Sequence, residues 1–325
     1  NMPVMDGIET LARLRRDEEY RELPVLVVTG HDDRDERNRI LKAGASNHIS
    51  KPIDGDILVE RVRHLVETKR LHDQLSEFHA RLTSELATAA KMQRAVVPTP
   101  ADVQEIKDLY GVSLASQFIP TSELGGDYWT LQVIDDAVFG LMIADFTGHG
   151  ISAALNTFRL DMLLSRLGVC RTSPAEYLQV INGELSDVMA TDQFCTMLYA
   201  LIDTKRNTLT YAAAGSPPPL SGAIDAGEVN IGDGSGLPLG VHAQATYENR
   251  NIAFPAGSYL FLYSDVLPET VCAETGALET SGVVALVEAH KKADAYAALD
   301  GLLSRFLEKA PDVLTDDLTA VWLSR

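Results

Sequence analysis

Four aspartates stand where a chain can hold a carboxylate at a fixed point while its backbone lets a ligand come close. One follows two glycines, two end apolar runs, and one precedes the last apolar run: Asp127, Asp145, Asp265 and Asp316. Carboxylate oxygens with no nearby cysteine and few histidines suit hard divalent cations, Mg²⁺ or Mn²⁺, better than Zn²⁺. One such aspartate alone is more often a turn or cap residue, so the order of all four carries the prediction of a cation site.

Short strands and glycine-rich turns are expected to position these carboxylates from about residue 110 onward. The apolar runs 141–144 and 259–264 predict strands that end at Asp145 and Asp265, and a last strand follows Asp316. Two long helical stretches are expected near 151–168 and 174–190.

Four short motifs contain the aspartates, in this order: GGDYW at 125–129, ADFTGHG at 144–150, YSD at 263–265 and DDLT at 316–319. Together they resemble the elements GGDFY, DxSGHG, YTDG and DD-hydrophobe-T of the metal-dependent protein phosphatase (PPM) family, in its bacterial SpoIIE/RsbU branch. Three further segments agree with the resemblance: CTMLY at 195–199, AGSPPPL at 214–220 and GLPLG at 236–240. The resemblance spans roughly residues 110–325, and we expect the domain over 105–325.

The resemblance implies an α+β phosphatase domain, a β-sandwich flanked by helices, with a two-metal site at one end. Carried over position by position, Asp145 bridges two Mn²⁺ or Mg²⁺ ions and Asp127 binds one of them; both are the expected catalytic residues. The family's backbone-carbonyl ligand falls on Phe146. The other ion falls to Asp265 and Asp316, with Asp317 beside the site. Two cations would activate water for in-line attack on phosphorus without a covalent enzyme intermediate.

The histidine of ADFTGHG, His149, has two readings that stay open. It is placed to be a proton donor, and it is equally a turn histidine between two glycines.

Three departures from the family pattern lead to a rival hypothesis. Val266 and Pro268 replace the glycine and second threonine of YTDGVTE, and Ser216 replaces the histidine of AGHPPPL. Valine disfavours the positive φ that glycine permits, so the loop after Asp265 is expected to be remodelled. The main hypothesis is a protein serine/threonine phosphatase that acts on an anti-sigma-factor antagonist. The alternative is a weak or inactive adaptor, similar to RssB, that binds a sigma factor.

The first 66 residues alternate between helix and strand, as in a doubly wound parallel sheet of the α/β class. The string NMPVMDG, Thr29 and Lys51-Pro52 resemble the second half of a response-regulator receiver domain. By that resemblance Asn1 gives a backbone carbonyl to Mg²⁺, Thr29 is the switch hydroxyl, and Lys51 pairs with the phosphate. The phospho-accepting aspartate would lie two residues before Asn1, so we expect a fragment that its histidine kinase could phosphorylate only at full length.

A long helix is expected between the two domains, with residues 67–98 as the linker. Residues 56–97 contain neither Pro nor Gly, and apolar side chains recur at alternating spacings of three and four: Leu71, Leu75, Phe78, Leu82, Leu86 and Ala89. This seam predicts a parallel coiled coil and a homodimer. The alternative is an amphipathic helix that packs on its own domain.

Charge and composition exclude several classes of partner. The 46 acidic and 28 basic residues give a net charge of −18, which repels nucleic acid and anionic membranes. No apolar run is long enough for a transmembrane helix. Three cysteines without metal-ligand spacing, and no secretory signal, lead us to expect a cytoplasmic protein.

Overall fold

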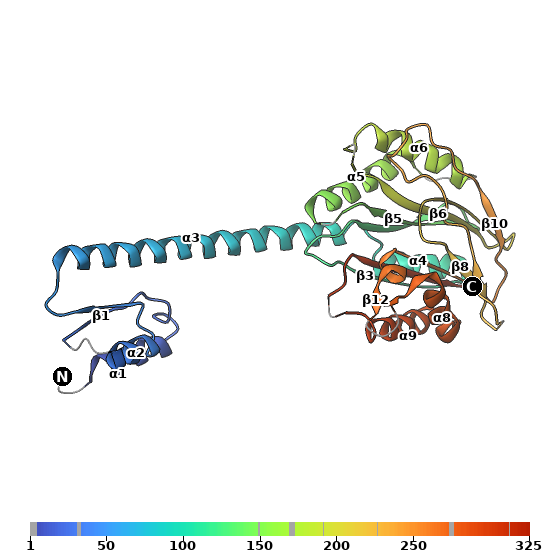
Figure 1. Ribbon diagram of the computed structural model, residues 1–325. Coiled ribbons are helices and arrows are strands. Elements are labelled where there is room, and N and C mark those ends of the chain that lie inside the picture. Colours follow the sequence, from blue (N-terminus) through green and yellow to red (C-terminus); the bar gives the residue numbers. More distant parts are fainter. Residues whose placement is uncertain are drawn as a thin grey trace. The chain divides into compact units, whose positions relative to one another are not determined.

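The structure is a computed structural model that describes residues 5–30, 34–148, 150–168, 173–190, 192–225, 227–272, 276–311 and 313–325 (Figure 1). The chain divides into two compact units, Asn1–Glu85 and Leu86–Arg325. In the described part of the chain, no helix is both long and apolar enough to cross a membrane.

The N-terminal unit contains a small parallel sheet, as the receiver resemblance predicts. Its elements before the long helix are α1 (Gly7–Arg16), β1 (Leu26–Thr29), α2 (Arg34–Lys42) and β2 (Asn47–Ser50). β1 and β2 pair in parallel, and Leu11, Ile40 and Ile49 are buried. The predicted α/β class of this segment is confirmed.

The long helix α3 runs from Gly55 to Arg94 without interruption. Asp54 caps its start, since its Oδ1 accepts from the backbone N–H of Asp56 at 2.9 Å. Helix α3 passes through residue 67, where the linker was expected to begin. The domain limits 1–66, 67–98 and 105–325 therefore stay predictions.

The C-terminal unit is a sandwich of two antiparallel sheets with helices on both outer faces (Figure 1). The described strands are ordered β10-β7-β6-β5-β4 in the first sheet and β3-β14-β11-β8-β9 in the second. The first sheet consists of β4 (Asp127–Val133), β5 (Val138–Phe146), β6 (Cys195–Asp203), β7 (Thr208–Ala214) and β10 (Arg250–Ala253). The second consists of β3 (Ser113–Ile119), β8 (Leu220–Ala223), β9 (Asn230–Ile231), β11 (Ser258–Tyr263) and β14 (Leu318–Ser324). The remaining elements are α4 (Pro100–Tyr110), α5 (Ile151–Leu167), α6 (Pro174–Ser186), α7 (Val266–Glu269), β12 (Val271–Cys272), β13 (Gly276–Ala277), α8 (Glu279–His290) and α9 (Ala295–Leu307).

Three layers of apolar packing hold this unit together. The middle layer lies between the sheets and joins Phe139 and Leu141 to Leu260 and Val321. A second layer joins the first sheet to α5 and α6, and a third joins the second sheet to α8 and α9. The strands are therefore buried on both faces, and their ends are fixed points on which a site can be built.

Helix α4 was not expected from the sequence. A capping box begins it: the Thr99 side chain accepts from the N–H of Asp102, and the Asp102 carboxylate accepts from the N–H of Thr99. Pro100 stands in the first turn, where its missing N–H costs nothing. The pattern Thr-Pro-x-Asp was a signal that could have predicted this helix.

Candidate metal centre

Two of the predicted carboxylates face each other across neighbouring strands of the first sheet. Asp127 opens β4, and it pairs with Asp145 near the end of β5. Asp127 is only 2% exposed, and its Oδ2 has no hydrogen-bond partner. Burial, and then the charge of Asp145, raise the pKa of Asp127 well above its ordinary value. A buried carboxylate oxygen without a donor is costly unless a proton or a cation compensates it.

Two more carboxylates reach the same place from the second sheet. Burial raises the pKa of Asp145 to about 8, and the next largest causes are the negative charges of Asp265 and Asp316. Burial, Glu269 and then Asp316 raise the pKa of Asp265 to about 6. The structure thus brings all four predicted aspartates within electrostatic reach of one another.

The segment after Asp265 is a short helix, which differs from the remodelled loop that the sequence suggested. Val266 is the first residue of α7 and is buried in the layer between the second sheet and α8. Because Thr270 donates its N–H to the Val266 carbonyl at 3.0 Å, the chain needs no positive φ here. Pro268 lies in the first turn, where no N–H is required.

Asp317 is a positioning residue, in agreement with its predicted place beside the site. It is 2% exposed, and its Oδ1 accepts from the Thr121 N–H at 2.7 Å. Its Oδ2 accepts from the Gly126 N–H at 2.6 Å. Both oxygens are therefore engaged in fixing the loop that leads into Asp127.

The two glycines before Asp127 are required by close packing. A Cβ at Gly126 would lie 2.7 Å from the Phe146 carbonyl oxygen, and a Cβ at Gly125 would lie 2.6 Å from Asp317 Oδ2. The carbonyl that the family resemblance assigns to the metal thus lies directly beside the Asp127 loop.

Sequence reasoning missed the residues that hold this arrangement. Gln93, buried at the end of α3, donates from Nε2 to the Gly125 carbonyl at 2.6 Å and accepts from the Gly125 N–H at 3.1 Å. Ser264 donates to the Asp317 carbonyl at 3.1 Å and so ties the Asp265 strand to β14. Gln93 lies near the end of the long predicted helix, and nothing in its local sequence assigns it a contact.

The donor chemistry fits hard divalent cations. The converging groups are carboxylates, Asp127 Oδ2 lacks a donor, and no cationic side chain appears among the causes that set the pKa values of Asp127, Asp145 and Asp265. Among the described residues, no three acidic, histidine or cysteine side chains are already grouped as a formed metal cluster. The ligand roles therefore remain a proposal.

In the N-terminal unit, Thr29 and Lys51 lie at the ends of adjacent parallel strands. Thr29 pairs with Ser50, and the Lys51 N–H donates to the Thr29 carbonyl at 2.8 Å. Asn1 and His149 lie outside the described residues. The metal-ligand role of Asn1 and the role of His149 therefore stay predictions.

Known proteins resemble both units. A family model described as Stage II sporulation protein E (SpoIIE) matches residues 135–325, and one described as a response regulator receiver domain matches residues 1–63. Phosphoserine phosphatase RsbU of Bacillus subtilis (strain 168) is 26% identical over 270 residues, which are 83% of this chain and 78% of RsbU. Phosphoserine phosphatase RsbP of the same strain is 28% identical over 193 residues, 58% of this chain and 46% of RsbP.

Solved structures share the fold. The SiaA-PP2C domain of Pseudomonas aeruginosa superposes with a TM-score of 0.67 at 18% identity, over 76% of this chain and 98% of that domain. RsbX, solved in complex with magnesium, superposes with a TM-score of 0.51 at 13% identity, over 65% of this chain and 94% of its own. These similarities confirm the predicted α+β sandwich.

Proposed function

The chain belongs to the SpoIIE family of protein phosphatases and carries a receiver segment at residues 1–63; from this premise we propose that it hydrolyses phosphoserine or phosphothreonine on a partner protein. The observation that carries the proposal is the pairing of Asp127 with Asp145 across β4 and β5, with Asp265 and Asp316 close enough to raise the pKa of Asp145. Surplus negative charge at one buried point suits a phosphate-hydrolysing centre that works with divalent cations.

We assign the ligands as the family resemblance does. Asp145 would hold both cations, Mn²⁺ or Mg²⁺, and Asp127 with the Phe146 carbonyl would hold one of them. Asp265 and Asp316 would hold the other. When bound, the cations supply Lewis acidity and neutralise the charge of the phosphate.

The chain's own residues supply the geometry for this chemistry. Asp317 fixes the Gly126 N–H and thereby the position of Asp127, while Gln93 holds Gly125 from the other side. Since these groups are buried and hydrogen-bonded, Asp127 needs little reorganisation when charge develops at the phosphate.

The partner proteins are inferred from the relatives and the receiver segment. RsbU and RsbP are phosphoserine phosphatases, so the substrate we propose is a phosphorylated antagonist of an anti-sigma factor. The receiver segment implies a cognate histidine kinase, and we propose that the receiver domain of the full-length protein gates the phosphatase.

A homodimer through α3 is a further part of the proposal. Leu71 and Leu75 are 61% and 66% exposed, and Phe78 is 53% exposed. An apolar seam of this kind, at coiled-coil spacing, is buried when a second α3 packs against it. Light scattering at micromolar concentration tests this: a dimer mass is expected, and a monomer mass would reject the coiled coil.

The adaptor alternative loses two of the three observations that motivated it, and Ser216 remains. It rested on Val266, Pro268 and Ser216, and Val266 and Pro268 fit α7 without strain. All four carboxylates that the family resemblance assigns to the metals are present in the chain, which an adaptor does not need.

The test is hydrolysis of p-nitrophenyl phosphate with added Mn²⁺, using Asp145→Ala as the matched control. We expect turnover by the unmodified protein and loss of at least about 100-fold in the variant, because metal centres supply several kcal/mol of transition-state stabilisation. Equal rates for the two proteins would reject the enzyme and leave the adaptor.

A further inference from the structure

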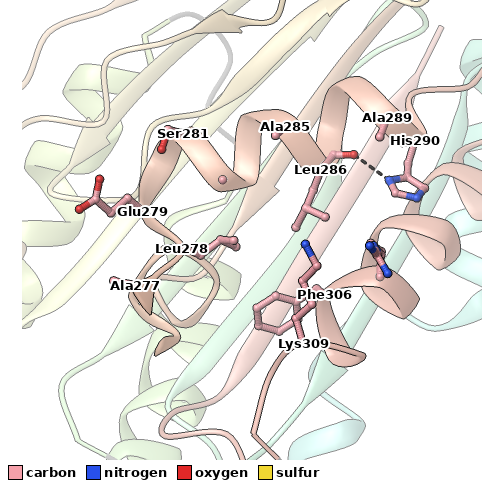
Figure 2. Close-up of a pocket in the computed structure, with 12 residues that line it drawn as sticks. Ala277, Leu278, Glu279, Ser281, Ala285, Leu286, Ala289, His290, Phe306 and Lys309 are labelled. Carbon is pink, nitrogen blue, oxygen red and sulfur yellow. Dashed lines mark hydrogen bonds between the residues drawn. The ribbon is translucent and has the colours of Figure 1, made fainter. Parts of the chain in front are cut away.

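A groove lies between α8 and α9, on the outer face of the second sheet. Its volume is about 650 Å³, within the range of small-molecule sites. Figure 2 shows Leu278, Leu286 and Phe306 among its lining residues, with Glu279 and His290 at opposite ends of α8. None of these residues belongs to the carboxylate centre.

The apolar part of the groove offers a surface on which the apolar part of a ligand can pack. Leu286 and Phe306 form its buried floor, and the small side chains Ala285 and Ala289 leave space above it. Small residues on the exposed side of α8 thus keep a hollow open that a larger side chain would fill.

Two cationic side chains line the same groove, Arg305 and Lys309. Within the described residues no carboxylate lies at ion-pair distance from Lys309. Arg305 contacts Glu308 at 2.7 Å, but both side chains are more than half exposed, and such exposed pairs contribute little. In a chain of net charge −18, two cationic side chains in one groove favour an anionic ligand.

His290, at the end of the groove, is held in one orientation by α8 and α9. Its Nδ1 lies 2.8 Å from the Leu286 carbonyl oxygen (Figure 2). Because a carbonyl can only accept, Nδ1 carries the proton and Nε2 is left to the surroundings. The ring also lies against Gly301 of α9, where a Cβ would come within 2.9 Å of its Cδ2.

The other end of the groove is acidic, which gives a ligand one preferred direction. Glu279 opens α8 with a φ of +53°, a conformation that non-glycine residues seldom adopt. Its carboxylate repels an anionic head group, which is therefore expected near Arg305 and Lys309.

We propose that this groove binds a small ligand with an apolar body and one anionic head group, in the manner of a medium-chain carboxylate. The body lies over Leu286 and Phe306, and the head group accepts hydrogen bonds from Lys309 and Arg305. Charge-assisted hydrogen bonds are the stronger kind, so the anion and the apolar body are both required.

The experiment uses the full chain and 1-anilinonaphthalene-8-sulfonate, an aromatic sulfonate, as the fluorescent probe. Octanoate is the competitor, and octan-1-ol and inorganic phosphate each lack one of the two features. Lys309→Glu reverses a groove charge, and Ala285→Trp fills the hollow. Lys107→Glu, an equivalent reversal on the exposed face of α4, is the control.

We expect octanoate to displace the probe, and octan-1-ol and phosphate to do so about tenfold less well. Both groove variants should lose about tenfold in probe affinity, while Lys107→Glu binds like the unmodified protein. Unchanged affinity in both groove variants, or equal displacement by octan-1-ol, would overturn the proposal.

Hydrogen exchange of the unmodified protein keeps the test valid if a variant folds poorly. Octanoate should protect the amides of residues 277–290 and 305–309, and protection confined to other segments would also reject the groove.

Discussion

The two halves of the carboxylate centre are built in different ways. Asp127 and Asp145 lie inside paired strands of the first sheet, and we call them the strand pair. Asp265 follows β11 and Asp316 precedes β14, and we call them the loop pair. The hydrogen bonds between β4 and β5 fix the positions of the strand pair. The positions of the loop pair depend on the segments that connect the strands.

This difference teaches where the centre is rigid and where it can adjust. Asp127 is almost fully buried and Asp145 is half-buried. β5 pairs with β6 along its whole length and with β4 from Phe139 to Asp145. Asp265 and Asp316 are half-buried at the ends of connections. Replacing a strand-pair ligand should therefore cause a loss of activity that added metal does not restore. Added metal should partly restore the activity lost when a loop-pair ligand is replaced.

The largest expected effect comes from exchanging one carboxylate in each pair. Asp127→Asn should lower kcat for p-nitrophenyl phosphate by at least about 100-fold at any Mn²⁺ concentration. Asp316→Asn should cost about tenfold at saturating Mn²⁺, with most of the loss in metal affinity. Equal losses that Mn²⁺ does not restore would remove the distinction between the pairs.

The next effect concerns the support of the strand pair. Asp317→Ala leaves the N–H groups of Thr121 and Gly126 without their acceptor, and each buried orphan costs about 1–3 kcal/mol. Denaturant unfolding should show a loss of about 2–4 kcal/mol. Asp300→Ala, on the exposed face of α9, is the control and should change stability little; a loss below about 1 kcal/mol for Asp317→Ala would mean that the loop is held in another way.

A comparable but smaller change is expected behind the loop pair. Val266→Gly restores the family's residue yet removes a buried side chain that packs between the second sheet and α8. We expect a loss of about 2–3 kcal/mol in the free energy of unfolding and no gain in kcat. A rise in kcat without loss of stability would show that Val266 impairs the site.

Counted per pH unit, the smallest effect is the pH dependence of the free energy of unfolding in EDTA. The pKa values of Asp145, about 8, and Asp265, about 6, exceed the unfolded value of about 3.9. The folded chain therefore holds protons that the unfolded chain has released, and its stability falls as pH rises from about 4 to about 8.

Between pH 6 and 8 the free energy of unfolding should fall by about 1 kcal/mol per pH unit. Asp145→Asn should flatten this slope and be more stable than the unmodified protein at pH 8, as measured by thermal melting. A slope of equal steepness in the variant would assign the titration to other groups.

The motifs predicted the carboxylates but not what holds them. Asp127, Asp145, Asp265 and Asp316 could be found because each stands at a strand end or a glycine turn in a fixed order. The local sequence does not reveal long-range partners such as Gln93 and Thr121. A buried glutamine on a mostly exposed helix, for example, cannot be distinguished by sequence from any other polar residue of that helix.

The fold shows the same division between local and long-range information. The long helix and the α/β class of the first segment could be predicted from periodicity, whereas the sandwich was implied by the family resemblance of the motifs. The α7 helix could not, because the expectation at Val266 rested on the glycine of the family pattern. Tertiary packing of Val266 and Leu267 in the layer beneath α8 decides that backbone instead.

The most direct test of the central claim is the number of Mn²⁺ ions bound per chain, measured by titration calorimetry with electron paramagnetic resonance. We predict two ions with magnetic coupling between them, one uncoupled ion in Asp265→Asn, and no tight site in Asp145→Asn. A single uncoupled ion in the unmodified protein, or binding that Asp145→Asn leaves unchanged, would contradict a two-metal centre shared by the strand pair and the loop pair.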